Sequence, residues 1–162
     1  MKKASRTAYI ILHNIRSTHN VGAIFRTADA VGITKIYLTG YTPTPIDRFG
    51  RPRKDIAKAA LGAEDTVAWE QVLRIGTLLI KLKKEGFYIV AVEQHAKSAT
   101  YTDVVPQGKT VFIFGNEIAG LPASVLKDAD VIAEIPMRGE KESLNVSVSA
   151  GIALFRILEN EV

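Results

Sequence analysis

The sequence contains no cysteine, so it can form no disulfide, no cysteine-ligated zinc site and no thiolate nucleophile. This absence is typical of a reducing compartment, and we expect a cytoplasmic protein. Long apolar runs are absent as well. The longest, Phe87 to Val92, has six residues, far fewer than the ~20 that span a bilayer. We therefore expect no membrane partner.

Three common motifs are also missing. No G-x-G-x-x-G follows the first apolar run, which excludes the dinucleotide-binding fingerprint, and no G-x-x-x-x-G-K-[ST] indicates a P-loop. No G-x-S-x-G presents a nucleophilic serine. The histidines are His13, His19 and His95. They lie in separate segments without metal-ligand spacing, so we expect no metal site.

What the chain has is an ordinary globular composition and unevenly placed charge. Its 162 residues are 47% hydrophobic and 23% charged, which fits a single folded domain over residues 1–162. The net charge is only +4, yet residues 1–6 and 47–58 hold more than that excess. Two basic segments on a nearly neutral body favour a polyanionic partner; the alternative is a solvated loop that happens to be basic.

Apolar runs alternate with segments of helical periodicity. Five runs, continuous enough for strands buried on both faces, are predicted at Ala8–His13, Lys35–Thr39, Phe87–Glu93, Thr110–Phe114 and Val131–Ile135. Helices are predicted over Asn20–Val31, Glu70–Glu85 and Leu144–Asn160, with a short one from Leu121. This alternation predicts an α/β fold with a mostly parallel sheet covered by helices on both faces. The one long irregular stretch, Gly40–Lys54, suits a functional loop.

Polar residues gather where predicted strands end, which is where open α/β sheets bind ligands. Asn20 is placed to cap a helix, and Arg26 falls away from that helix's apolar stripe, although it could simply form a surface ion pair. Glu117 lies between Gly115 and Gly120, either beside a ligand or in a tight turn near a helix N-terminus.

A third polar segment follows the last predicted strand. Ser143 is a natural helix N-cap, which is a purely structural explanation for it. Asn145 and the serines after it alternate with apolar residues. Polar groups so close to a core face suggest a backbone that packs against a ligand or another element.

These three segments, in this order, resemble the motifs of the SpoU (TrmH-type) branch of the SPOUT methyltransferases. The first is similar to N-x-G-x-x-x-R-T-A-x-A-x-G at Asn20–Gly32, and the second to F-G-x-E-x-x-G-L-P at Phe114–Pro122. The third is similar to I-P-M-x-G-x-x-x-S-L-N-V-S-V at Ile135–Val148. The resemblance implies an S-adenosylmethionine-dependent RNA ribose 2′-O-methyltransferase that acts as a homodimer, with a C-terminal trefoil knot.

The resemblance also implies roles for residues. The cofactor would lie against loops after three strands, held by Val92, Gly115, Asn116, Ile135, Met137, Ser143 and Leu144. Arg26 would act as a clamp and charge stabiliser beside the RNA phosphate, and could reach the cofactor of the partner subunit. The positioning residues would be Asn20, Glu117, Ser143 and Asn145.

The resemblance covers the catalytic domain alone, and we expect no added RNA-binding domain. RNA selection would then rest on basic residues outside the motifs, which are Arg6, Arg48, Arg51, Arg53 and Lys54. Transfer RNA is the preferred substrate in this interpretation and ribosomal RNA a close second. The alternative function is that of a non-catalytic RNA-binding or assembly protein that has kept the fold.

Overall fold

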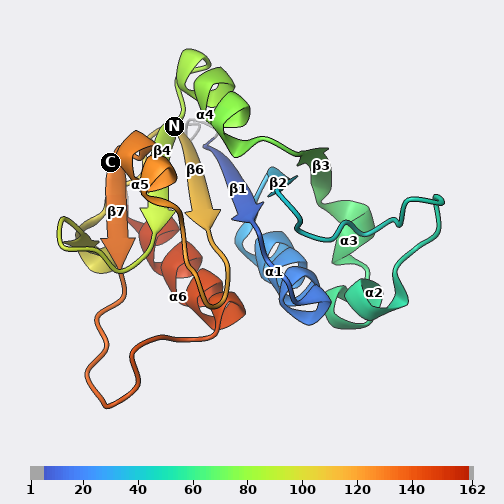
Figure 1. The fold of residues 1–162 in the computed structure, drawn as a ribbon. Helices are drawn as coiled ribbons and strands as arrows, with labels where there is room; N and C mark the ends of the chain where they lie inside the picture. Colours follow the sequence, from blue (N-terminus) through green and yellow to red (C-terminus); the bar gives the residue numbers. More distant parts are fainter. Residues whose placement is uncertain (1–5, 161–162) are drawn as a thin grey trace.

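The computed structural model describes residues 6–160, which form a seven-stranded parallel sheet (Figure 1). Its strands are β1 (Thr7–His13), β2 (Lys35–Thr39), β3 (Ala68–Val72), β4 (Tyr88–Val92), β5 (Ala99–Thr100), β6 (Lys109–Phe114) and β7 (Val131–Glu134). Their spatial order is β3-β2-β1-β6-β4-β7-β5, and every neighbouring pair runs parallel. All seven carboxyl ends therefore point to the same edge of the sheet.

Helices cover both faces of this sheet. They are α1 (Thr18–Val31), α2 (Lys54–Ala60), α3 (Ala63–Thr66), α4 (Ile75–Lys84), α5 (Ala123–Asp128) and α6 (Val146–Glu159), with a 3₁₀ turn at Tyr101–Asp103. Helices α1 and α6 lie side by side against one face, with α2 and α3 beside α1 (Figure 1). Helices α4 and α5 cover the other face. The predicted α/β fold is confirmed.

Alternation along the central strands creates two apolar cores. In β1, Ile10 and Leu12 join the core under α1 and α6, whereas Ile11 joins the core under α4. In β6, Phe112 and Ile113 divide in the same way. Because both faces of a strand such as β1 are buried, its sequence is nearly continuous in apolar residues, and this explains why the central strands were predictable.

One predicted helix is wrong at its start. Glu70, assigned from the sequence to a helix over Glu70–Glu85, lies in β3, and the helix begins only at Ile75. β3 is an edge strand whose residues are exposed or half-buried, so it lacks the continuous apolar run of a central strand. Val72 happens to lie three residues before Ile75, which imitates helical spacing.

Two helix starts also differ from prediction because other residues cap them. Ser17 is the N-cap of α1, and its Oγ accepts a hydrogen bond from the Asn20 backbone N–H at 3.1 Å. Asn145 is the N-cap of α6, and its Oδ1 accepts from the Ser147 N–H at 2.9 Å. Asn20 and Ser143 are therefore not caps, and both side chains are available for other contacts. The trefoil knot concerns how the chain threads through itself and stays a prediction.

Candidate functional site

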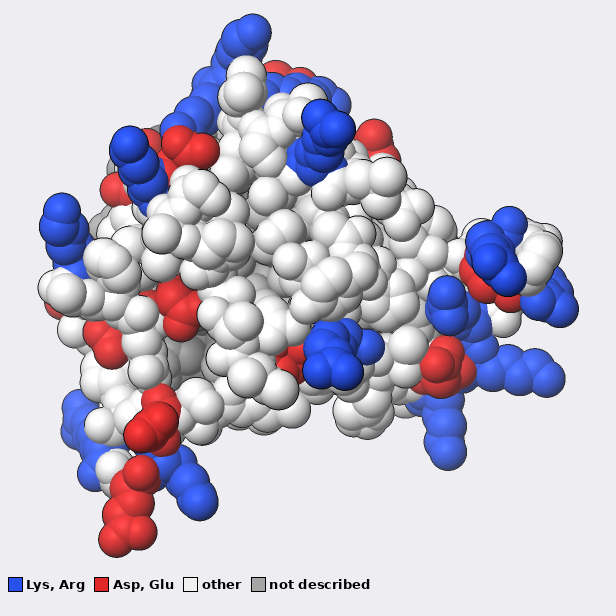
Figure 2. Space-filling view, viewed as in Figure 1, with Lys and Arg blue, Asp and Glu red and all other residues white. Residues whose placement is uncertain are grey.

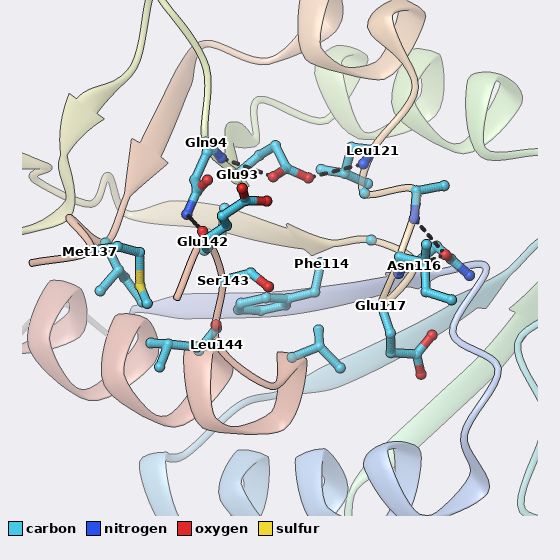
Figure 3. Close-up of a pocket in the computed structure, with 18 of the residues that line it drawn as sticks. Glu93, Gln94, Phe114, Asn116, Glu117, Leu121, Met137, Glu142, Ser143 and Leu144 are labelled. Carbon is cyan, nitrogen blue, oxygen red and sulfur yellow. Dashed lines mark hydrogen bonds between the residues drawn. The ribbon is translucent and has the colours of Figure 1, made fainter. Parts of the chain in front are cut away.

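A cavity of ≈ 420 Å³ opens at the carboxyl edge of the sheet (Figure 3). Its walls are the loops that follow β4, β6 and β7, together with the start of α6. The structure brings together here all the residues that the sequence assigned to the cofactor: Val92, Gly115, Asn116, Ile135, Met137, Ser143 and Leu144. The cavity is also lined by residues that the sequence analysis did not assign to the cofactor, which are Glu93, Gln94, Phe114, Glu117, Ile118, Ala119, Gly120, Leu121, Leu126, Glu142, Val146 and Ser149.

The loop after β6 folds into a tight turn that only glycine permits at two points. Asn116 holds the turn, since its Oδ1 accepts hydrogen bonds from the backbone N–H groups of Ile118 and Ala119 at 2.9 and 2.8 Å. Gly120 has φ +67°, and a Cβ there would lie 2.4 Å from Glu93 Oε2. A Cβ on Gly115 would lie 2.7 Å from the Gly120 carbonyl carbon. The turn thus brings bare backbone to the cavity wall.

Two side chains that follow β4 tie the three loops together. Glu93 Oε2 accepts a hydrogen bond from the Leu121 backbone N–H at 3.0 Å, and Gln94 Nε2 donates to the Glu142 carbonyl at 2.6 Å (Figure 3). The sequence offered one signal for this role, an acidic residue directly after a buried strand. These bonds fix the cavity walls relative to one another.

The cavity is acidic as well as partly apolar. Three carboxylates line it, those of Glu93, Glu117 and Glu142, whereas no lysine or arginine of residues 6–160 is among the lining residues. Phe114, Leu121 and other apolar side chains supply the rest of the wall. A negative potential of this kind favours a ligand that carries positive charge and disfavours free phosphate groups.

Glu117 connects the three motif segments at one side of the cavity. Its carboxylate accepts hydrogen bonds from the backbone N–H groups of Arg16 and Ser17 and from Asn20 Nδ2, each at 3.1 Å. Asn145 Nδ2 in turn donates to Asn20 Oδ1 at 3.2 Å. Burial raises the pKa of Glu117, but these hydrogen bonds outweigh it and hold its pKa below the ordinary 4.5. A charged Glu117 thus organises the start of α1.

Arg26 does not join this arrangement. It lies exposed on α1, it does not line the cavity, and within residues 6–160 its guanidinium forms no hydrogen bond or ion pair. The predicted exposure away from the apolar stripe is confirmed, while the surface ion pair suggested as an alternative does not form among these residues. Among residues 6–160, no hydrogen bond joins the Arg26 side chain to Glu117, Asn20, Ser143 or Asn145.

Arg6, a predicted RNA contact, is bonded to the C-terminal end of α6. Its guanidinium donates to the carbonyl of Leu158 and, at 3.2 Å, to that of Asn160, at the C-terminal end of α6. These bonds satisfy carbonyls at a helix end and place a positive charge where the helix dipole favours one. Arg6 therefore holds the end of α6, and its role in binding RNA stays a prediction. Lys2 and Lys3, from the same basic segment, lie outside the described residues.

The other predicted RNA contacts lie in one loop, residues 40–53, which we call the basic loop, and at the start of the helix that follows it. Asp47 folds its tip, because its Oδ1 accepts from the backbone N–H groups of Phe49 and Arg51 at 2.8 and 3.0 Å. Arg48 and Arg51 are exposed, as is Lys54 at the start of α2, and Arg53 is half-buried. Figure 2 shows cationic side chains, with carboxylates among them, projecting at the right of the molecule, the side on which Figure 1 places the segment between β2 and α2.

Two kinds of site have no counterpart in the part of the chain that the structure describes. Residues 6–160 contain no group of three or more His, Asp or Glu side chains able to hold a metal ion. None of their helices combines the length and the apolar character needed to cross a bilayer.

The sequence matches the family model of the SpoU rRNA Methylase family over residues 7–155. The chain belongs to the SpoU rRNA Methylase family. Among its relatives is a 23S rRNA (guanosine-2′-O-)-methyltransferase of Neisseria meningitidis, 34% identical over 94% of this chain and 60% of the relative. An uncharacterized tRNA/rRNA methyltransferase of Mycoplasma pneumoniae is 33% identical over 93% of this chain and 60% of the relative.

Solved structures of SpoU proteins share the fold. An AdoMet-bound rRNA methyltransferase from Sinorhizobium meliloti superposes with a TM-score of 0.83 at 30% identity, over 94% of this chain and 56% of that one. The A. aeolicus TrmH/SpoU tRNA modifying enzyme gives 0.82 at 30% identity, over 96% of this chain and 76% of that one. The chain spans about 60% of the length of the curated relatives it matches.

Proposed function

We propose that this SpoU-family chain is an S-adenosylmethionine-dependent methyltransferase acting on a ribose 2′-hydroxyl of RNA. The observation that carries the proposal is the acidic cavity, since its walls are the second and third motif segments and its Glu117 is bonded to the first. Relatives named as guanosine-2′-O-methyltransferases support the same chemistry. A non-catalytic RNA-binding protein would not need such a cavity.

The residues present fit this cofactor. S-adenosylmethionine carries a positive sulfonium and a flat adenosine, and the cavity offers three carboxylates, apolar side chains and the bare backbone of the Gly115–Leu121 turn. Val92, Ile135, Met137 and Leu144 would hold the adenosine, while Gly115, Asn116 and Ser143 would contact it through the loops. A related rRNA methyltransferase structure is named as AdoMet-bound, which supports this assignment.

When bound, S-adenosylmethionine supplies a methyl group whose bond to sulfur breaks as its bond to the ribose 2′-oxygen forms, while the hydroxyl proton leaves. The residues of this chain would hold the ribose 2′-hydroxyl in line with the methyl group and keep the ribose from binding in orientations that cannot react. Glu117 stays ionised and fixes Asn20, and Asn20 fixes Asn145 at the start of α6. Ser143 lines the cavity in the same segment. These four would position the ribose and the loops.

Arg26 would serve this reaction across a homodimer. Because Arg26 is exposed, does not line its own cavity and is free of partners among the described residues, its guanidinium is available to the cavity of a second copy. There it would clamp the RNA phosphate and stabilise charge, with the phosphate accepting the 2′-hydroxyl proton. Arginine is effectively always protonated, which makes it a poor base and a suitable clamp.

The basic loop would supply affinity for the RNA backbone through Arg48, Arg51 and Arg53, together with Lys54 at the start of α2. Arg6, also a predicted RNA contact, lies outside this loop and bonds to the end of α6. Ribosomal RNA is the better-supported substrate, because the Neisseria meningitidis relative is named for 23S rRNA and the Sinorhizobium meliloti structure for rRNA, and this reverses the preference for transfer RNA drawn from the sequence. A cytoplasmic location stays part of the proposal.

One assay tests the function directly. The protein is incubated with labelled S-adenosylmethionine and total RNA, and the labelled RNA is mapped for positions that resist alkaline cleavage, as 2′-O-methylated positions do. We expect label in ribosomal RNA at a discrete resistant position. Label on a base, or binding of RNA without any transfer, would contradict the proposal, the second result favouring the non-catalytic alternative.

A further inference from the structure

A second cavity lies at the base of the basic loop, outside the site described above. Its volume is ≈ 320 Å³, within the range of about 300–1,000 Å³ typical of small-ligand pockets. The loop itself and β3 form its walls, with polar groups from Tyr41, Thr44, Asp47, Arg48, Arg53 and Gln71. Two guanidinium groups against one carboxylate give the wall a positive charge.

Arg53, which lines this cavity, has a hydrogen-bond donor without an acceptor. Its Nε is buried and has no hydrogen-bond partner, and among the described residues it is the one buried side-chain donor or acceptor left in that state. Its backbone, by contrast, is held, since the Arg53 N–H donates to the Pro45 carbonyl at 2.8 Å. Buried donors are normally satisfied. Because Arg53 lines the cavity, a small shift of its side chain would bring this donor to an acceptor such as a phosphate oxygen.

The carboxylate of Asp47, which lines the same cavity, does not accept a hydrogen bond from Arg53 Nε. Its Oδ1 already accepts the backbone N–H groups of Phe49 and Arg51, and its Oδ2 lies 3.1 Å from Arg51 Nε. The backbone hydrogen bond from Arg51, the other bonds and the nearby charge of Arg53 hold the pKa of Asp47 below its ordinary value. Asp47 is thus committed to folding the loop, and Arg53 keeps its free donor.

An exposed aromatic ring stands at the tip of the same loop. Phe49 is 65% exposed, and the guanidinium carbons of Arg48 and Arg51 lie 4.7 and 4.9 Å from its ring centroid. An exposed phenylalanine has no role in the core. Arginine and aromatic planes held together in this way are the surfaces on which unpaired RNA bases stack.

The second cavity is also joined to the first. Tyr41, which lines the second cavity, accepts a hydrogen bond through its hydroxyl from Asn116 Nδ2 at 2.9 Å, and Asn116 lines the first. The same Nδ2 group donates to the Asn14 carbonyl at 2.9 Å. A ligand in the second cavity therefore lies beside the loop that walls the first.

We propose that the basic loop binds one unpaired nucleotide of the RNA, with its phosphate on Arg53 and Arg48 and its base packed against the stack formed by Phe49 and its two arginines. The inference rests on the proposed function, because it takes the RNA bound at the basic loop to be the RNA whose ribose is methylated. It goes further by naming the substrate class. The preferred RNA has an unpaired nucleotide close to the methylated one, whereas a continuous duplex is a poor ligand.

The test compares two RNA hairpins that differ only in one bulged nucleotide, which is 2-aminopurine in the bulged RNA. Binding to the full chain is measured by anisotropy, and stacking by quenching of the 2-aminopurine. We expect the protein to bind the bulged RNA more tightly and to quench its fluorescence. Phe49→Ala should remove the quenching and weaken binding of the bulged RNA by about tenfold, with little effect on the paired one.

Matched variants separate stacking from the phosphate contact. Arg53→Lys keeps the charge but removes the buried Nε–H donor, so we expect weaker binding of the bulged RNA with quenching preserved. Lys84→Ala and Ile80→Ala remove an exposed cation and an exposed apolar side chain from α4, and both should bind like the unaltered protein. Equal affinity of the unaltered protein for both hairpins, or quenching that survives Phe49→Ala, would overturn the inference.

Further measurements on the same protein samples distinguish a failure of this inference from a failure of the proposed function. Calorimetry with S-adenosylmethionine and methyl transfer to ribosomal RNA are measured alongside. If methyl transfer occurs but the two hairpins bind alike, the unpaired-nucleotide site is wrong and the proposed function stands. If the bulged hairpin is preferred and stacked but no methyl group is transferred, the nucleotide site stands and the proposed function is wrong.

Discussion

The two cavities of this protein lie at the same edge of one sheet and have opposite electrostatics. The first is built from the C-terminal half of the chain and is lined by Glu93, Glu117 and Glu142. The second belongs to the basic loop between β2 and α2 and presents Arg48 and Arg53. One hydrogen bond, from Asn116 to Tyr41, links them.

This difference shows how one edge can sort two ligands of opposite charge. A cationic methyl donor is attracted to the acidic cavity and repelled from the basic loop, and a polyanionic RNA behaves the other way round. The two regions also differ in construction: bare glycine backbone shapes the first, whereas exposed side chains on a folded loop make up the second. We therefore expect mutations in the two regions to have separable effects.

Arg26 belongs to neither region, and its removal should have the largest effect. Arg26→Ala should lower turnover by about 10²–10³-fold, the cost of deleting one group that stabilises charge in a transition state. Affinity for S-adenosylmethionine should be unchanged, because Arg26 does not line the cavity. Single-turnover methyl transfer and calorimetry measure the two quantities, with Lys84→Ala as the control.

Mixed dimers tell whether Arg26 acts across subunits. Co-expression of an Arg26→Ala chain with a Gly120→Ala chain is assayed at an S-adenosylmethionine concentration too low to fill the Gly120→Ala cavity. Under this condition a filled cavity meets an intact arginine only if the two belong to different copies. We expect partial recovery of turnover in this mixture. Full activity of Arg26→Ala alone, or no recovery in mixed dimers, would show that its assigned role is wrong.

Gly120 and Gly50 compare the construction of the two regions. Both have positive φ, so alanine at either should cost about 1–2 kcal/mol of folding stability for the left-handed backbone. Only at Gly120 would the added Cβ meet an atom, Glu93 Oε2 at 2.4 Å, whereas nothing lies within 4 Å at Gly50. Gly120→Ala should therefore weaken S-adenosylmethionine binding about tenfold in calorimetry, a change of about 1.4 kcal/mol, and Gly50→Ala should leave it unchanged.

Glu117→Gln tests whether charge organises the cavity wall. Because the folded-state pKa of Glu117 is lowered, its stabilisation is present above the ordinary pKa of 4.5 and is lost as the pH falls through the folded pKa. The variant should lose about 1–2 kcal/mol of unfolding free energy at pH 7 and less at pH 4. Urea unfolding at the two pH values measures this; an equal loss at both would show that ionisation is irrelevant.

The smallest effect is expected from the exposed arginines of the basic loop. Arg48→Ala with Arg51→Ala should weaken RNA binding and lower the salt slope by about one to two units, since each lost phosphate contact removes ~0.9 in duplex DNA. S-adenosylmethionine affinity should stay the same. Anisotropy over a salt series measures the slope, and an unchanged slope would place RNA elsewhere on the protein.

The parts of the fold that could be predicted are those buried on both sides. β1, β2, β4, β6 and β7 are recognisable because burial on two faces demands continuous apolar residues. β3 was missed because it is an edge strand, and β5 because two residues carry no pattern. The seven-residue helix α2 follows a proline-rich loop and has too few turns for a recognisable stripe.

The candidate site divides similarly. Its motif residues could be placed from the sequence, since local patterns carry them, and the structure gathers the second and third segments around one cavity. The hydrogen bond of Glu93 could not be predicted from the sequence, because its partner Leu121 lies 28 residues away and only the sheet order brings the two together. The role of Arg6 depends on Leu158, 152 residues away, which no local pattern encodes.

The sheet order has a consequence for how the chain folds during synthesis. β1 is flanked by β2 and β6, and β6 is made last of the three. At about 5–20 residues per second, a ribosome needs roughly 5–20 s to pass from His13 to Lys109. For that time β1 keeps one unpaired edge in a stretch of strongly apolar sequence, which is the situation in which chains aggregate. The nascent protein should depend on chaperones until Phe114 has emerged, more than a protein with sequentially paired strands.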